Sequence, residues 1–275
     1  MKINKQVLEK LPCREQLEYV FRQAKEISFG KIGRNQEGYI YKGNKLPRCT
    51  NILKMDGSKS EALMLWARRQ VAGRAEQELM SLWQQHPLSA EEIHKVCANA
   101  INEPDRQLHI AANVGTDEHD NIEHWLFREP YKETDALKRF RIAWNKFEGM
   151  IIATEVPIAW VDEQTGLGFG GRLDMLIWKN GNIYIGDNKT SKTIHESYGC
   201  QIAGYKNAVE QMSGYNLNIH GGVIFHIPDF KVMNDKQKAE YEKYGSLVEC
   251  KNLEAAFEHY RLLLGLYNCR NNKYF

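Results

Sequence analysis

The chain lacks the long apolar runs that place a protein in a membrane. No stretch of its 275 residues approaches the roughly 18 consecutive apolar residues that a membrane-spanning helix needs. The N-terminal segment, Met-Lys-Ile-Asn-Lys, is followed by mixed charge rather than by the apolar core of a secretion signal. We therefore expect a cytoplasmic protein with no membrane partner.

Closely paired cysteines are also absent. The sequence has 6 cysteines but no Cys-x-x-Cys pair, which argues against a zinc finger. Reduced thiols are the default in a cytosolic protein. Distant cysteines can meet in space, but no local spacing supports an iron–sulfur cluster, and we expect none.

A strong charge of one sign is missing as well. The formal net charge is +2. Residues 1–110 contain 18 Lys and Arg and 13 Asp and Glu, whereas residues 111–275 contain 19 Lys and Arg and 22 Asp and Glu. This mild asymmetry is compatible with a basic N-terminal part that guides a polyanion towards an acidic centre. Charge alone does not identify nucleic acid as the substrate.

The sequence contains no repeats and no low-complexity linker, but the spacing of its apolar residues changes along the chain from a helical to a mixed pattern. Residues 1–110 are predicted to form a mainly helical lobe with a short β-hairpin in 38–53, and residues 111–275 an α/β core with a mixed sheet. The expected helices span 4–28, 59–85, a segment starting at Ser89, 117–127, 135–150, 200–212 and 254–267. Strands are expected from 155 onward and at 221–227.

A β-hairpin in the second part brings two carboxylates and a lysine together. Asp174 begins one apolar run, a Lys-Asn-Gly-Asn turn follows, and the return run ends at Asp187, Asn188 and Lys189. Antiparallel pairing makes the two aspartates neighbours, and period-two alternation points Asp187 and Lys189 to the same face. Because paired carboxylates repel unless a cation lies between them, the hairpin indicates a metal-dependent phosphodiester-cleaving site.

The acid-x-Lys pattern is common, so the choice of this site depends on its surroundings. Asp229-Phe230-Lys231 and Glu249-Cys250-Lys251 match it too, and a single match is usually a solvated charge pair. The hairpin match is favoured because its partner strand begins with a second carboxylate.

Other segments add candidates on both sides of the hairpin. Upstream, Thr116 is a candidate N-cap for a helix on which His119 shares a face with Ile122, and Glu155 precedes a strand. Downstream, Gln201 and Tyr205 are four residues apart on one helical face. Each alone has an ordinary structural explanation, such as a core histidine, an edge charge or a helix surface.

In this order, the segments GTDEHDNIE, TEVPIAW, GGRLD, DNKTSK and QIAGY resemble the PD-(D/E)XK nuclease superfamily, specifically its RecB-like exonuclease branch. A weaker resemblance covers Pro47–Leu53 and a following Leu-Met-Leu-Trp-Ala segment. These are similar to elements of phage nucleases, the first being shared with the mitochondrial genome maintenance exonuclease. Arg48 and Cys49 replace the usual Ser-Val of that element, which leaves the role of its serine open.

The resemblance implies a role for each matching residue. Asp174, Asp187 and the Asn188 carbonyl would bind Mg²⁺ or Mn²⁺, and His119 would add an imidazole ligand that favours Mn²⁺. Lys189 would orient or deprotonate the attacking water or neutralise the phosphorane. The remaining implied catalytic residues, which position Lys189 or the DNA or serve a second metal, are Gln201, Tyr205 and Glu155.

Four arginines are candidate DNA contacts. Arg172 lies just before Asp174, Arg48 occupies the altered phage-type element, and Arg68 and Arg69 lie on a predicted helix that also carries tryptophans. That helix has an equally good interpretation as a charged helix with its tryptophans in a core.

The resemblance therefore predicts a metal-dependent DNA exonuclease acting on single-stranded or frayed ends, in phage or prophage DNA processing, with a single-strand-annealing or recombination partner. Two alternatives stay open. One is a structure-specific or CRISPR-adaptation-like endonuclease, and the other is an inactive DNA-binding protein of the same fold. The sequence does not indicate cleavage polarity or oligomeric state.

Overall fold

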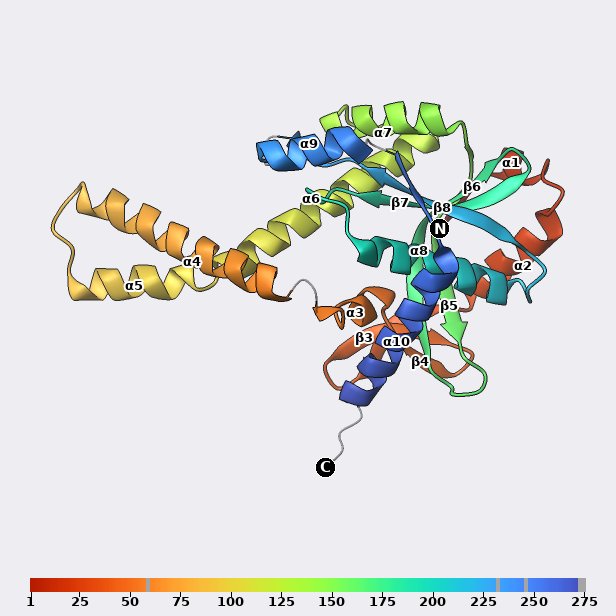
Figure 1. The fold of residues 1–275 in the computed structure, drawn as a ribbon, viewed down its shortest axis with the longest axis horizontal. Coiled ribbons are helices and arrows are strands. Elements are labelled where there is room, and N and C mark those ends of the chain that lie inside the picture. The colour runs from red at the N-terminus through yellow and green to blue at the C-terminus, as the bar shows by residue number, and fades with distance from the viewer. Residues whose placement is uncertain (58–59, 231–232, 245–246, 272–275) are drawn as a thin grey trace. The chain divides into compact units, whose positions relative to one another are not determined.

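The chain folds into two compact units, which we describe separately because their relative placement is not defined. The computed structural model describes residues 1–57, 60–230, 233–244 and 247–271 (Figure 1). Residues 1–56 and 118–275 form the first unit, and residues 57–117 form the second. Residues 1–56 thus group with the sheet-containing part, whereas the sequence suggested a division near residue 110.

The first unit is built on a mixed sheet of six strands. The strand order is β1-β5-β6-β7-β8-β9, and all neighbours are antiparallel except the β7–β8 pair, which is parallel. The helix α8 connects these two parallel strands, as parallel pairing requires a crossover. The strands are β1 (Lys2–Ile3), β5 (Met150–Val161), β6 (Gly168–Lys179), β7 (Asn182–Lys189), β8 (Ile219–His226) and β9 (Leu247–Cys250).

Helices cover both faces of this sheet, which confirms a mixed α/β fold with a central mixed sheet (Figure 1). One apolar cluster lies between the sheet and α2, α3, α8 and α10, and a second lies between the sheet and α7. The buried strands are rich in Ile, Val and Leu because both faces are covered. The helices are α2 (Arg14–Lys25), α3 (Cys49–Leu53), α7 (Asp135–Phe147), α8 (Glu196–Met212) and α10 (Leu253–Asn271).

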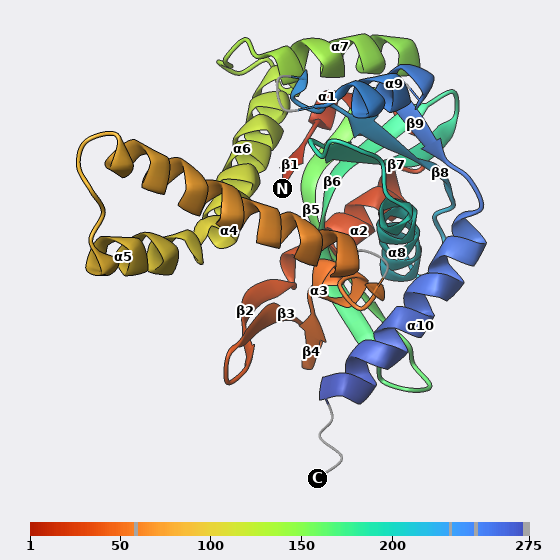
Figure 2. The same ribbon diagram turned by 60° about the vertical axis from the view of Figure 1, so that its left-hand side comes forward.

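A small antiparallel sheet lies against the N-terminal half of β6. It contains β2 (Ser28–Gly33), β3 (Gln36–Tyr41) and β4 (Asn44–Pro47), of which the sequence predicted the β3–β4 hairpin (Figure 2). Tyr39 packs so closely on Gly170 that a Cβ there would lie 2.4 Å from the tyrosine side chain. Arg48, the residue after β4, also forms an isolated bridge with Gly170.

The second unit consists of helices. It holds α4 (Ser60–Trp83), α5 (Ala90–Ala100) and the first part of α6 (Glu103–Leu126), and the division between the units falls within α6. Ser89 and Glu92 form the capping box at the start of α5, so this predicted helix start is confirmed. Lys59, at the predicted start of the long helix, lies outside the described residues.

Two helix predictions were wrong, one because the helix is interrupted and one because it begins earlier. The predicted helix 4–28 is two helices, α1 (Lys5–Leu8) and α2, with Pro12 between them, because proline cannot donate the backbone hydrogen bond of a helix interior. Thr116 is no N-cap, since α6 begins at Glu103 and runs through this position. Its hydroxyl donates instead to the Ala112 carbonyl at 3.1 Å.

Several short elements have weak sequence signals and were not predicted. They are β1, β2, α9 (Asp235–Tyr244) and β9, and β5 begins at Met150 rather than near Glu155. Short edge strands gain their stability from pairing with a neighbour, which a local pattern does not show. Within the described ranges, no helix combines the length and apolar character needed to cross a membrane.

Candidate active site

Three neighbouring strands carry three carboxylates at the same level of the sheet. Met175 on β6 pairs with the residue before Glu155 on β5 and with the residue before Asp187 on β7. The next position along these strands therefore places Asp174 between Glu155 and Asp187. The sheet itself thus brings together three acids, of which the first and the last are 32 residues apart in the sequence.

The hairpin that joins β6 to β7 has the predicted turn. Asn180 and Gly181 have φ values of 49° and 84°, as expected for the Asn-Gly turn that matches the twist of paired strands. The predicted proximity of the aspartates is confirmed at the strand ends, where the Asn188 amide donates to Asp174 Oδ2 at 2.9 Å.

His119 reaches this cluster from α6. Ligand atoms of His119, Glu155 and Asp174 all lie within 4.8 Å of one another. One ring nitrogen, Nδ1, is 3.4 Å from Asp174 Oδ2, and the other, Nε2, is 3.2 Å from the Asn188 carbonyl oxygen. The side chain that the sequence singled out therefore meets both the carboxylate and the carbonyl expected beside it.

Lys189 is held by a chain of polar contacts behind the carboxylates. Its Nζ lies 2.5 Å from Asp187 Oδ2 and donates to Gln201 Oε1 at 3.0 Å. Gln201 Nε2 in turn donates to the Tyr205 hydroxyl at 2.8 Å. Because Gln201 and Tyr205 are buried on one face of α8, the ammonium group is fixed by two elements, β7 and α8.

Tyr198 also contacts the lysine and was missed by the sequence analysis. The Lys189 ammonium lies 5.0 Å from the centre of its ring, within the range of a cation–π interaction. Tyr198 is three residues before Gln201 on α8, so the i, i+3, i+7 stripe with Tyr205 was the signal that would have found it.

Burial and like charge dominate the electrostatics of the site. Burial raises the pKa of Asp187, and the Asp174 carboxylate adds to the increase while Lys189 opposes it. Burial, followed by Asp174, raises the pKa of Glu155 to about 7. For Lys189, burial lowers the pKa, but the Asp187 and Asp174 carboxylates outweigh it and the net pKa is raised. The site thus concentrates negative charge that one lysine only partly compensates.

Glu155 has an unusual backbone. Its φ of 52° lies in the left-handed region, which is costly for a residue with a Cβ. Its carboxylate pairs with Arg172 Nε at 2.5 Å, and Arg172 is largely exposed. The pairing of β5 with β6 continues on both sides of Glu155, and its carboxylate joins the cluster.

The donor set fits a divalent cation. Carboxylates, a backbone carbonyl and one imidazole are ligands of Mg²⁺ and Mn²⁺. Asp187 is 1% exposed, and its Oδ1 has no hydrogen-bond partner among the residues that the structure describes. A buried carboxylate oxygen without a donor is costly, and a cation would satisfy it.

The other predicted DNA contacts are on other elements of the chain. Arg48 lies beside the small sheet of the first unit, whereas Arg68 and Arg69 are exposed on α4 of the second unit. Of the competing acid-x-Lys matches, Glu249 is exposed on β9, and Lys231 falls outside the described residues.

Comparison with known proteins does not show a family for this chain. No protein-family model matches the sequence, and no curated protein shows significant similarity to it.

Proposed function

We propose that this protein is a metal-dependent deoxyribonuclease that hydrolyses phosphodiester bonds, and that it acts as an exonuclease. The observation that carries the proposal is the convergence of His119, Glu155 and Asp174 beside the ion pair of Lys189 with the buried Asp187. Clustered carboxylates can hold a divalent cation. A cation with an adjacent lysine suits a substrate that is both anionic and slow to react.

The chain's own groups would hold the cation and the phosphate. Asp174, Asp187, the Asn188 carbonyl and His119 would ligate Mn²⁺ or Mg²⁺, with Glu155 as a ligand of a second ion or of water. When bound, the metal would supply Lewis-acid polarisation of the phosphate and a more acidic water. The imidazole favours activity with Mn²⁺ over Mg²⁺.

Lys189 would act on the reacting phosphate or water. Asp187 and Gln201 use two of its three N–H donors, so the ammonium is oriented before the substrate arrives. Preorganised charge at the position where negative charge develops lowers a barrier more than a mobile lysine would. Gln201 and Tyr205 are positioning residues because they act through Lys189.

The order of elements supports the PD-(D/E)XK assignment that the motifs suggested. The helices α6 and α7 precede three antiparallel strands, β5 to β7, and α8 then leads to β8, which is parallel to β7. The acidic residues and the lysine lie on the three strands, and the Gln and Tyr lie on the helix that follows. This arrangement agrees with the roles that the resemblance implies.

Cleavage of DNA by site variants tests the proposal. Lys189→Ala and Asp187→Asn should each reduce Mn²⁺-dependent cleavage of end-labelled DNA by about 10²-fold or more, with DNA binding retained. Lys251→Ala, at an exposed lysine of a competing acid-x-Lys match, is the matched control and should cleave normally. Cleavage that survives both site changes would overturn the site assignment.

The exonuclease assignment rests on the family resemblance and has its own test. Linear single-stranded DNA should be degraded while circular single strands of the same sequence persist. Equal degradation of both would identify an endonuclease instead. Absence of cleavage with Mn²⁺ and Mg²⁺, together with retained DNA binding, would identify an inactive DNA-binding protein of this fold.

A further inference from the structure

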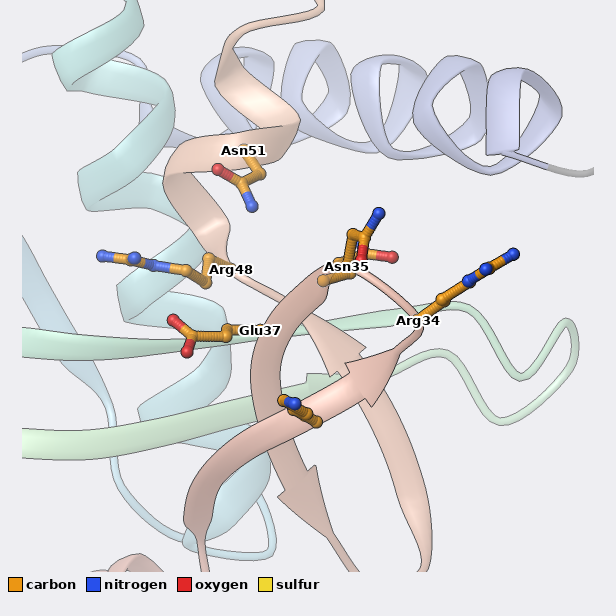
Figure 3. A pocket seen from close by; sticks show the side chains of 7 residues that line it. Arg34, Asn35, Glu37, Arg48 and Asn51 are labelled. Carbon is orange, nitrogen blue, oxygen red and sulfur yellow. The ribbon is translucent and has the colours of Figure 1, made fainter.

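The small sheet of the first unit carries a basic pocket outside the carboxylate cluster. The pocket measures about 420 Å³, which is within the size range of ligand sites. Figure 3 shows that Arg48 and Glu37 extend to one side whereas Arg34 extends to the other. The lining residues are Lys31, Arg34, Asn35, Gln36, Glu37, Arg48 and Asn51.

The cations of this pocket are spread out and not engaged with protein acids. Within the described part of the chain, none of Lys31, Arg34 and Arg48 forms an ion pair. Positive charges distributed along a pocket suit successive phosphates of a strand better than one small anion. Among the described residues that line the pocket, Glu37 is the only acid, and it lies directly across the strand pair from Lys31.

An exposed aromatic ring lies beside these cations. Phe29 is 52% exposed, and the Arg48 guanidinium lies 5.6 Å from the centre of its ring. Tyr39 supports the ring edge-on at 5.2 Å. A rigid exposed ring next to an arginine is the combination on which unpaired bases stack in single-strand-binding proteins.

The sheet register connects this surface to the carboxylate cluster. Arg48 bridges Gly170 on β6, and Asp174 lies four residues further along the same strand. At about 3.3 Å per residue, this separation is about 13 Å. Arg172 lies between the two positions and is exposed, and it pairs with Glu155 of the cluster, so one guanidinium group lies between the two surfaces.

We propose that Phe29, Arg48, Lys31 and Arg34 form a binding track for an unpaired DNA strand whose scissile phosphate lies at the carboxylate cluster. This inference rests on the proposed nuclease function and specifies its substrate as single-stranded. Phe29 stacks on a base, and the cations contact flanking phosphates. A duplex base is already stacked on its neighbours, so only an unpaired strand can use the Phe29 ring.

Binding measured in EDTA separates this track from catalysis. Fluorescence anisotropy of a labelled oligothymidylate should show about tenfold weaker binding for Phe29→Ala and near-normal binding for Phe29→Tyr. A labelled DNA duplex should bind Phe29→Ala and the wild type alike. The same 275-residue chain is used throughout, and because Phe29 is exposed, these variants should fold like the wild type.

Charge variants test the phosphate contacts. Arg48→Ala should weaken binding and reduce the slope of log affinity against log salt concentration by about one. Lys45→Ala, at an exposed lysine on the same sheet that does not line the pocket, is the matched control and should leave both nearly unchanged. Glu37→Gln should tighten binding because it removes the acid of the pocket.

The outcomes for the track and for the nuclease function are distinguishable. Hydrolysis of bis(4-nitrophenyl) phosphate by the wild type with Mn²⁺ needs only the carboxylate cluster, so it reports the nuclease function independently of the track. Normal oligothymidylate binding by Phe29→Ala, an Arg48→Ala effect no larger than that of Lys45→Ala, or no binding by the wild type would each overturn the track. If the proposed nuclease function is wrong, the wild type itself will not hydrolyse this phosphodiester.

Discussion

The carboxylate cluster and the basic face of the small sheet use charge in opposite ways. At the cluster, Asp187 is buried and Lys189 is largely shielded, and neighbouring strands and a helix hold both, so that each charge strongly affects the pKa of the others. On the small sheet, Lys31, Arg34 and Arg48 are exposed and unpaired among the described residues. Chemistry needs strong local fields and fixed geometry, whereas recognition of a long polyanion needs adaptable contacts in water.

The largest expected difference between the two regions is in how much a substitution in each lowers the free energy of unfolding. Lys189→Met leaves Asp187 buried beside Asp174 without its cation, and breaking a buried pair costs about 3–5 kcal/mol. Arg48→Ala should change the free energy of unfolding by less than about 0.5 kcal/mol, because its side chain is exposed. Urea denaturation in EDTA measures the free energy of unfolding of both variants. Equal losses would contradict the view that the lysine of the cluster is structurally fixed and that Arg48 is not.

The next largest expected difference between the two regions is in the stabilisation that a bound metal ion gives to variants of each. Mn²⁺ at about 100 times its Kd should stabilise the wild type by about 2.7 kcal/mol. For a chain of this size the corresponding rise in Tm is about 5–10 °C. Asp174→Asn should abolish the rise, and Arg48→Ala should retain it, in thermal denaturation with and without EDTA. A full shift in Asp174→Asn would show that the cation binds elsewhere.

The smallest expected effect concerns Glu155. Its pKa is raised to about 7 by burial and by Asp174, so the folded state binds a proton more tightly than the unfolded state. Its contribution is therefore favourable below the unfolded pKa of about 4.5 and is lost as the pH rises to about 7. Glu155→Gln should raise the stability of the metal-free protein at pH 8 by about 1 kcal/mol, because solvent around the partly exposed carboxylate screens much of the effect. The same variant should show no gain at pH 4.5, and an equal gain at both pH values would contradict the electrostatic cause.

The hairpin of the site could be predicted because its signals are local. An Asn-Gly turn between two apolar runs sets the register, and the register makes Asp174 and Asp187 neighbours. Period-two alternation then places Lys189 with Asp187, and period 3.6 places Gln201 with Tyr205. These predictions needed only the regular geometry of one hairpin and one helix.

Other parts of the site depend on contacts that no local pattern encodes. The helix start predicted at Thr116 was wrong because α6 continues through it, yet His119 still reaches the cluster. The positive φ of Glu155 and the packing of Tyr39 on Gly170 arise from pairing between distant segments. Phe29 and the cations near it form a surface only after β2, which the sequence did not predict, pairs with β3.

The sequence by itself determined the hairpin, the face of each acidic and basic residue on it, and the stripe on α8, because strand and helix periodicities follow from backbone sterics. Only the tertiary structure decided that His119 and Glu155 join Asp174, that Asp187 is buried beside Lys189, and that the small sheet presents Phe29 beside Arg48. The physical reason is that burial and charge proximity depend on which distant segments pack together, and electrostatic effects follow those distances rather than the order of residues.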